Sequence, residues 1–152
     1  YMKSTMIIIS GILERSQIRN SKSQIEDAVS GLRRAGQQDD LPRGLLTRAW
    51  LRFLEGDHDG AKQDLDEAWE IAERGPMKLF MADIHLYRAR LFGPRQAETK
   101  YPWRSPQEDL AAAEKLILRE TTYQKPDGTV ITARYARRDE ELADAKKAAK
   151  GW

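Results

Sequence analysis

Two histidines and their neighbouring carboxylates come closest to a catalytic or metal-binding pattern in this 152-residue chain. Asp57-His58-Asp59 combines imidazole and carboxylate groups, which are common metal ligands. The second histidine, His85, follows an aspartate by two residues, a spacing that points the two side chains to different faces of a helix. One hypothesis is therefore a small metal-dependent hydrolase that uses His58, His85 and nearby carboxylates. We favour the alternative, in which Gly56-Asp57 is a turn and Asp57 or Asp59 caps the following helix.

Clusters of like charge offer further candidates for acid–base chemistry or for nucleic-acid binding. Carboxylates gather at residues 64–67 and 139–141, but neither group comes with an evident pocket that would tune its pKa for catalysis. Arg33-Arg34 and Arg137-Arg138, the latter near Tyr135, are the kind of residues that contact RNA. Because acids balance the bases, we interpret these clusters as solvated surface and keep RNA binding as a second alternative function.

The overall composition excludes several classes of protein. With 26 basic and 24 acidic residues, the net charge is only +2, so no strong field steers the chain toward nucleic acid or an anionic membrane. The absence of cysteine excludes disulfides, thiolate metal sites and cysteine nucleophiles. The longest apolar run, residues 5–13, is shorter than the roughly 20 residues of a membrane span and predicts a buried helix or strand. We expect a cytoplasmic protein without a cofactor and without membrane contact.

Capping residues and hydrophobic periodicity divide most of the chain into predicted helices. Ser23 and Glu26 form a capping box, Asp40 suits an N-cap position, and Ser105 opens a second capping box. Around Pro126-Asp127-Gly128 the chain is rich in Thr, Tyr, Val and Ile, which predicts a β-hairpin. We expect an all-α fold with this small hairpin near the C-terminus, in a single domain over residues 1–152. Its expected parts are an N-terminal apolar segment (1–20), helical repeat units (23–120), a β-hairpin insertion (121–135) and a terminal helix (137–150).

The spacing of small residues indicates that the helices repeat. Ala61 follows Ala49 by 12 residues, and Leu65 and Ala68 come four and seven residues after Ala61. These are the spacings of the tetratricopeptide repeat (TPR), in which two helices cross closely. A second copy is visible, because LLTRAWLRF aligns with KLFMADIHL at an offset of 33 and DLDEAWEI aligns with DLAAAEKL at an offset of 45. The later unit therefore contains an insertion of 12 residues, at about 93–104.

The chain thus resembles a TPR domain with about two and a half units between residues 23 and 120. Residues 41–92 are similar to the C-terminal TPR arrays of bacterial NACHT/STAND-type signalling NTPases, and YARRDEELADA resembles the motif that closes such arrays. The resemblance implies antiparallel helix pairs in a short right-handed solenoid that acts as a sensor or scaffold. No G-x-x-x-x-G-K-[ST] motif is present, so we expect the chain to be a fragment of a larger bacterial protein whose NTPase part lies elsewhere.

In TPR arrays, the first helix of each pair lines a concave groove that binds partner peptides. By that register the groove-lining residues are Arg43, Leu46, Trp50, Leu54, Asp83, Leu86 and Tyr87. Such a mixture of charged and aromatic side chains suits peptide recognition. We therefore predict a non-catalytic module that binds a protein or peptide ligand. Its uncapped terminal faces could also pair with a second copy of the chain.

Overall fold

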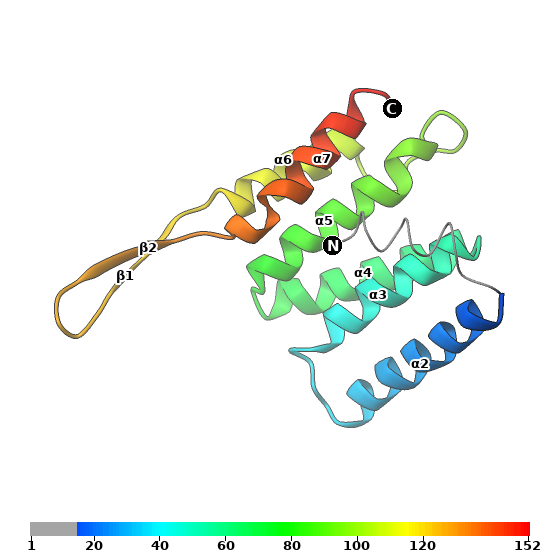
Figure 1. Ribbon diagram of the computed structural model, residues 1–152, viewed down its shortest axis with the longest axis horizontal. Helices are drawn as coiled ribbons and strands as arrows, with labels where there is room; N and C mark the ends of the chain where they lie inside the picture. The colour runs from blue at the N-terminus through cyan, green and yellow to red at the C-terminus, as the bar shows by residue number, and fades with distance from the viewer. Residues whose placement is uncertain (1–14) are drawn as a thin grey trace. The chain divides into compact units, whose positions relative to one another are not determined.

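The computed structural model describes residues 15–152, so the apolar segment predicted at residues 5–13 lies outside the described residues. Within this range helices predominate, and two strands form a small antiparallel sheet near the C-terminus, as expected (Figure 1). None of the described helices is long and apolar enough to cross a membrane. The elements are α2 (Arg15–Arg34), α3 (Leu41–Leu54), α4 (His58–Arg74), α5 (Lys78–Phe92), the 3-10 helix η1 (Gly93–Arg95), α6 (Pro106–Ile117), β1 (Thr121–Gln124), β2 (Val130–Ala133), the 3-10 helix η2 (Ala136–Arg138) and α7 (Asp139–Ala149).

The chain divides into two compact units, and the boundary falls within α4, between Ile71 and Ala72. The first unit contains α2, α3 and most of α4, and the second contains the end of α4 and all later elements. The single-domain organisation expected over residues 1–152 stays a prediction.

In the first unit, α2 packs closely against α3. A Cβ atom added to Gly44 of α3 would lie 3.3 Å from Val29 Cγ2 and 3.4 Å from Leu32 Cδ1, both on α2. The chain turns after α2 and α3, where Gly36 and Gly56 have φ angles of +67° and +87°. The turn at Gly56 was predicted from the sequence. Only glycine adopts this left-handed conformation without strain, so these two positions end the helices.

The start of α2 differs from the prediction. The capping box formed by Ser23 and Glu26 lies in the middle of the helix, which begins at Arg15. No glycine or proline interrupts residues 15–22, so the helix continues upstream and a cap at Ser23 is not needed. The N-cap predicted at Ser105 is confirmed, because Ser105 Oγ accepts a hydrogen bond from Glu108 N at 3.0 Å at the start of α6.

In the second unit, α5, α6 and α7 pack against one another around one hydrophobic core (Figure 1). Small residues allow the helices to approach closely, since Ala82 and Ala89 of α5 and Ala113 of α6 have no exposed surface. The core residues are Ala82, Leu86, Ala89, Leu110, Ala113, Ile117, Leu142 and Ala145. Acidic residues occupy the first turn of α7 and lysines its last turn, an arrangement that complements the helix dipole.

The predicted β-hairpin is confirmed. β1 and β2 pair in antiparallel register, with Tyr123 opposite Ile131. Asp127 Oδ1 accepts a hydrogen bond from Thr129 N at 2.8 Å, which stabilises the connecting turn. All strand residues are exposed, and the hairpin extends away from α6 and α7 (Figure 1). It therefore contributes no side chain to the core of the second unit.

Candidate functional site

The Asp57-His58-Asp59 stretch forms a turn and a helix cap. Asp57 Oδ1 accepts a hydrogen bond from Gly60 N at 2.9 Å, at the N-terminus of α4. The ring of His58 packs against that of Phe53, with 4.5 Å between the centroids. Among residues 15–152, no three His, Asp or Glu side chains are grouped so that they could hold a metal ion. The interpretation of this stretch as a turn and cap is confirmed.

The seven residues predicted to line a concave groove differ in their exposure. Three are accessible to solvent, namely Arg43, Leu54 and Tyr87. Four are buried, namely Leu46, Trp50, Asp83 and Leu86. Leu86 belongs to the hydrophobic core of the second unit, so its side chain faces the other helices of that unit. Because the seven residues are divided between the two units, the groove itself stays a prediction.

Asp83 is engaged by an arginine of its own unit. Its two carboxylate oxygens accept hydrogen bonds from Arg138 Nε at 2.6 Å and Arg138 Nη2 at 3.1 Å. These hydrogen bonds raise the pKa of Arg138 and hold η2 against α5. In the first unit, Arg33 Nη2 donates to Glu67 Oε2 at 2.6 Å. Two of the four arginines considered for RNA contact are therefore engaged in ion pairs within the chain.

A network of charged residues joins the helices of the first unit. Asp64 of α4 is 1% exposed and accepts hydrogen bonds from Arg48 Nε at 3.0 Å and Arg48 Nη2 at 2.7 Å. Arg52 Nη1 donates to the same carboxylate at 3.0 Å. Both arginines also reach Glu26 of α2, at 3.0 Å and 3.2 Å. The interpretation as solvated surface is therefore wrong for Asp64, whose buried charge is compensated by two guanidinium groups.

The same network sets the ionisation of two of its members. Burial alone would raise the pKa of Glu26, but Arg48 and Arg52 together hold that pKa below its usual value. Burial also opposes ionisation of Arg48, yet its hydrogen bonds and attraction to Asp64 raise its pKa overall. The pairing therefore favours the charged forms of Glu26 and Arg48.

A second buried carboxylate lies in the second unit. Asp109 of α6 is 6% exposed, and its Oδ1 lies 2.7 Å from Nδ1 of His85 on α5. The hydroxyl of Tyr101 donates a hydrogen bond to Oδ2 of Asp109. Burial and the neighbouring carboxylate raise the pKa of Tyr101, so its hydroxyl keeps its proton. This cluster was not predicted from the sequence, although the alignment of DLAAAEKL with DLDEAWEI places Asp109 at the position of Asp64.

Aromatic residues hold the inserted loop, residues 93–104, against α5. The ring of Trp103 makes edge contacts with Phe92 and Tyr101, at centroid distances of 5.2 Å and 5.5 Å. The guanidinium carbon of Arg88 lies 4.7 Å from the centroid of Trp103, within the range of a cation–π interaction. The loop is polar in composition, yet its final residues complete the packing around α5.

The cluster of His85, Asp109 and Tyr101 links α5, α6 and the inserted loop. An aspartate that orients an imidazole is a common part of a general base, but a general base must also reach a substrate. Here the side chains of His85 and Asp109 are only 13% and 8% exposed, and Tyr101 is buried. We therefore assign this cluster a structural role.

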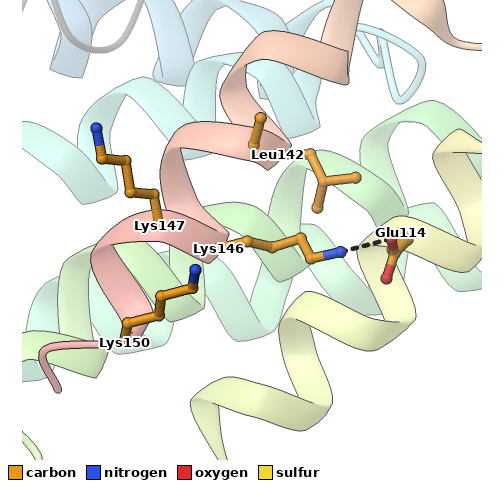
Figure 2. Close-up of a pocket in the computed structure, with 6 residues that line it drawn as sticks. Glu114, Leu142, Lys146, Lys147 and Lys150 are labelled. Atoms are coloured by element: carbon orange, nitrogen blue, oxygen red, sulfur yellow. Dashed lines mark hydrogen bonds and ion pairs between the residues drawn. The ribbon is translucent and has the colours of Figure 1, made fainter.

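An open groove of about 580 Å³ lies along α7 and beside α6. Its lining residues are Glu114, Leu142, Ala143, Lys146, Lys147 and Lys150. Lys146 Nζ reaches Glu114 Oε1 at 2.7 Å, whereas Lys147 points away from Glu114 (Figure 2). These lysines were not predicted to form a surface for a ligand.

Comparison of the chain with family models, with curated proteins and with solved structures gives no match.

Proposed function

We propose that this chain is a non-catalytic module that binds a protein or peptide. The observation that carries the proposal is the groove on α6 and α7, which combines apolar residues with a row of lysines. Such a surface offers nonpolar contact for an anchoring side chain and charged donors that fix its orientation. The concave groove expected from the TPR register is a second candidate contact surface.

Repeated contacts in the interior support the proposal that the helices form two copies of one unit. Under the sequence alignment, His85 stands at the position of Arg52, and Asp109 stands at that of Asp64. Arg52 Nη1 is 3.0 Å from Asp64 Oδ1, and His85 Nδ1 is 2.7 Å from Asp109 Oδ1. The alanines expected at close helix crossings are fully buried: Ala49, Ala61, Ala68, Ala82 and Ala113. These features favour a TPR-like repeat, and the resemblance to TPR arrays implies that the units form a short right-handed solenoid.

We further propose that the module is the sensor or scaffold segment of a larger cytoplasmic signalling protein of the bacterial NACHT/STAND type. This proposal depends on the resemblance of residues 41–92 to the arrays of those proteins. A nucleotide-binding module encoded upstream in the same reading frame would support it, and its absence from the complete reading frame would contradict it.

The two alternative functions receive less support. A hydrolase would use His58 and His85, but neighbouring side chains engage both rings. RNA binding through Arg137 and Arg138 would require both guanidinium groups, and Asp83 already holds that of Arg138. Peptide binding in the groove on α6 and α7 can use Ala143, Lys147 and Lys150, which are exposed.

Selection of peptides from a random-sequence display library against the purified chain tests the proposed function. We expect Ala143→Trp to abolish the binding of the selected peptides, because the indole would fill the groove. Ala148→Trp is the matched control, since Ala148 is also exposed on α7 but does not line the groove. Failure to select any binding peptide, or equal binding to both variants, would contradict the proposal.

A further inference from the structure

We infer that the groove on α6 and α7 binds an acidic amphipathic segment of a partner protein. The inference rests on the proposed function and specifies the chemistry of the partner. It is carried by three properties of the groove, namely its direction, its unpaired positive charge and its apolar floor.

The groove follows the axis of α7. Apart from Glu114 on α6, its lining residues lie on α7 and its C-cap, from Leu142 to Lys150. At a rise of about 1.5 Å per residue, these positions span about 12 Å, which corresponds to about two helical turns. A short helical segment laid along α7 therefore matches the length of the groove.

The charge left over in the groove is positive. Glu114 neutralises Lys146 through an ion pair of 2.7 Å. Lys147 and Lys150 are exposed and three positions apart, and no carboxylate among residues 15–152 pairs with either of them. Two acidic residues three or four positions apart on a helix lie on one face, so a partner helix can present carboxylates to both ammonium groups.

The floor of the groove is apolar. Ala143 is exposed, and Leu142, a residue of the hydrophobic core that is 5% exposed, also lines the groove. The methylene groups of the lysine side chains extend this nonpolar surface while their ammonium groups stay in water. The surface therefore suits a segment that carries apolar side chains beside its carboxylates.

A nucleic acid fits this surface less well than an acidic peptide. No aromatic side chain lines the groove to stack on bases. Two unpaired lysines are also fewer than the four to eight basic residues typical of anionic membrane recognition.

Fluorescence anisotropy with a labelled synthetic peptide tests the inference. The probe is a helix-forming peptide of about 16 residues, or about four turns, with leucines and glutamates along one face. In the control peptide, glutamine replaces every glutamate. We expect the glutamate peptide to bind more tightly and its affinity to fall as salt is raised, because salt screens exposed ion pairs.

Charge substitutions locate the binding site. Lys147→Glu together with Lys150→Glu should lower the affinity for the glutamate peptide about tenfold or more, since two ion pairs become repulsive contacts. Lys100→Glu together with Lys125→Glu makes the same change in net charge in exposed loops and should leave the affinity unchanged. Because glutamates at the end of α7 oppose its dipole, Lys147→Gln with Lys150→Gln serves as a milder second variant that should also weaken binding.

The outcomes separate this inference from the proposed function. If the two peptides bind with equal affinity, and Ala143→Trp abolishes the binding of both, the partner segment need not be acidic. That result would overturn the inference and still support peptide binding in the groove. Absence of binding by either peptide would overturn the inference, while the display selection tests the proposed function independently. Tighter binding of an RNA oligonucleotide or of anionic vesicles than of the glutamate peptide would also overturn the inference.

Discussion

Asp109 Oδ1 lies 2.7 Å from Nδ1 of His85, and this contact joins α6 to α5 inside the second unit. In the first unit, Asp64 Oδ1 accepts a hydrogen bond from Arg52 at 3.0 Å and so joins α4 to α3. Both carboxylates are buried, and each basic partner comes from the preceding α-helix. Each helix pair is thus held together by a polar contact as well as by the packing of alanines. Substitutions at these polar contacts should therefore lower the stability of the chain.

Asp64→Asn should lower the free energy of unfolding by about 3 kcal/mol, because it leaves the buried guanidinium of Arg48 without its main counter-charge. Asp66→Asn on the same helix is the control. Asp66 pairs with Lys62 at the surface, so its loss should cost less than about 1 kcal/mol. Urea denaturation followed by circular dichroism measures both variants. If the two variants lose the same free energy of unfolding, the buried ion pairs of Asp64 contribute no more to stability than the surface pair of Asp66.

In the Tyr101→Phe variant, the free energy of unfolding should fall less steeply as the pH rises into the alkaline range. Burial and Asp109 raise the pKa of Tyr101 above its usual value of 10.0, so the folded chain keeps a proton that the unfolded chain loses. The unfolded state then binds fewer protons, and stability falls as the pH rises above about 10. At neutral pH the variant should be less stable by about 1–2 kcal/mol, because Asp109 loses a hydrogen-bond donor.

Urea denaturation at a series of pH values from neutral to about 11 measures this effect, since the ordinary tyrosine pKa of about 10 lies within that range. Tyr123→Phe is the control, because Tyr123 is 59% exposed on the hairpin. In this variant the free energy of unfolding should fall with alkaline pH as steeply as in the unsubstituted protein. The same slope in Tyr101→Phe would mean that the Tyr101 hydroxyl does not retain its proton in the folded state.

The helices, the hairpin and the cap of α6 could be predicted because their signals are local. The spacing of Ala61, Leu65 and Ala68 marks the face of α4 that becomes fully buried. Ser105 precedes the amide that it caps by three residues, and Asp57 does the same. Signals of this kind depend on neighbours within one or two helical turns, and the sequence displays them directly.

The polar contacts could not be predicted because their partners lie far apart in the chain. Arg138 reaches Asp83 across 55 positions, and a charged residue on a predicted helix looks the same whether it is solvated or paired. Tyr101 lies in a segment whose polar composition indicates an exposed loop, yet its burial depends on packing against α5 and α6. The start of α2 was placed too late because a capping box can also occur inside a longer helix.

Gly93→Ala should displace Trp152 from the hydrophobic core of the second unit. A Cβ atom at Gly93 would lie within 3.0 Å of ring atoms of Trp152, which packs against that core. We expect a loss of about 1–3 kcal/mol in stability and a shift of tryptophan emission to longer wavelength. The emission shift should disappear when the same substitution is made in a Trp152→Phe background.

Gly31→Ala is the matched control for this substitution. Gly31 lies inside α2, and no atom would lie within 4 Å of a Cβ added there. The change should therefore stabilise the chain by about 1 kcal/mol, the difference in helix propensity between alanine and glycine. Unchanged emission in Gly93→Ala would contradict the contact between Gly93 and Trp152.

Gly128→Ala should unfold the hairpin and leave the helices intact. Gly128 has a φ angle of +87°, which costs a residue with a side chain about 1–2 kcal/mol. An isolated two-stranded hairpin is only marginally stable, and the exposed strands gain nothing from the helical core. Amide hydrogen exchange should therefore lose protection at residues 121–133, while thermal unfolding of the helices keeps its midpoint. A lower midpoint would show that the hairpin stabilises the helices, and unchanged protection would show that the turn tolerates alanine.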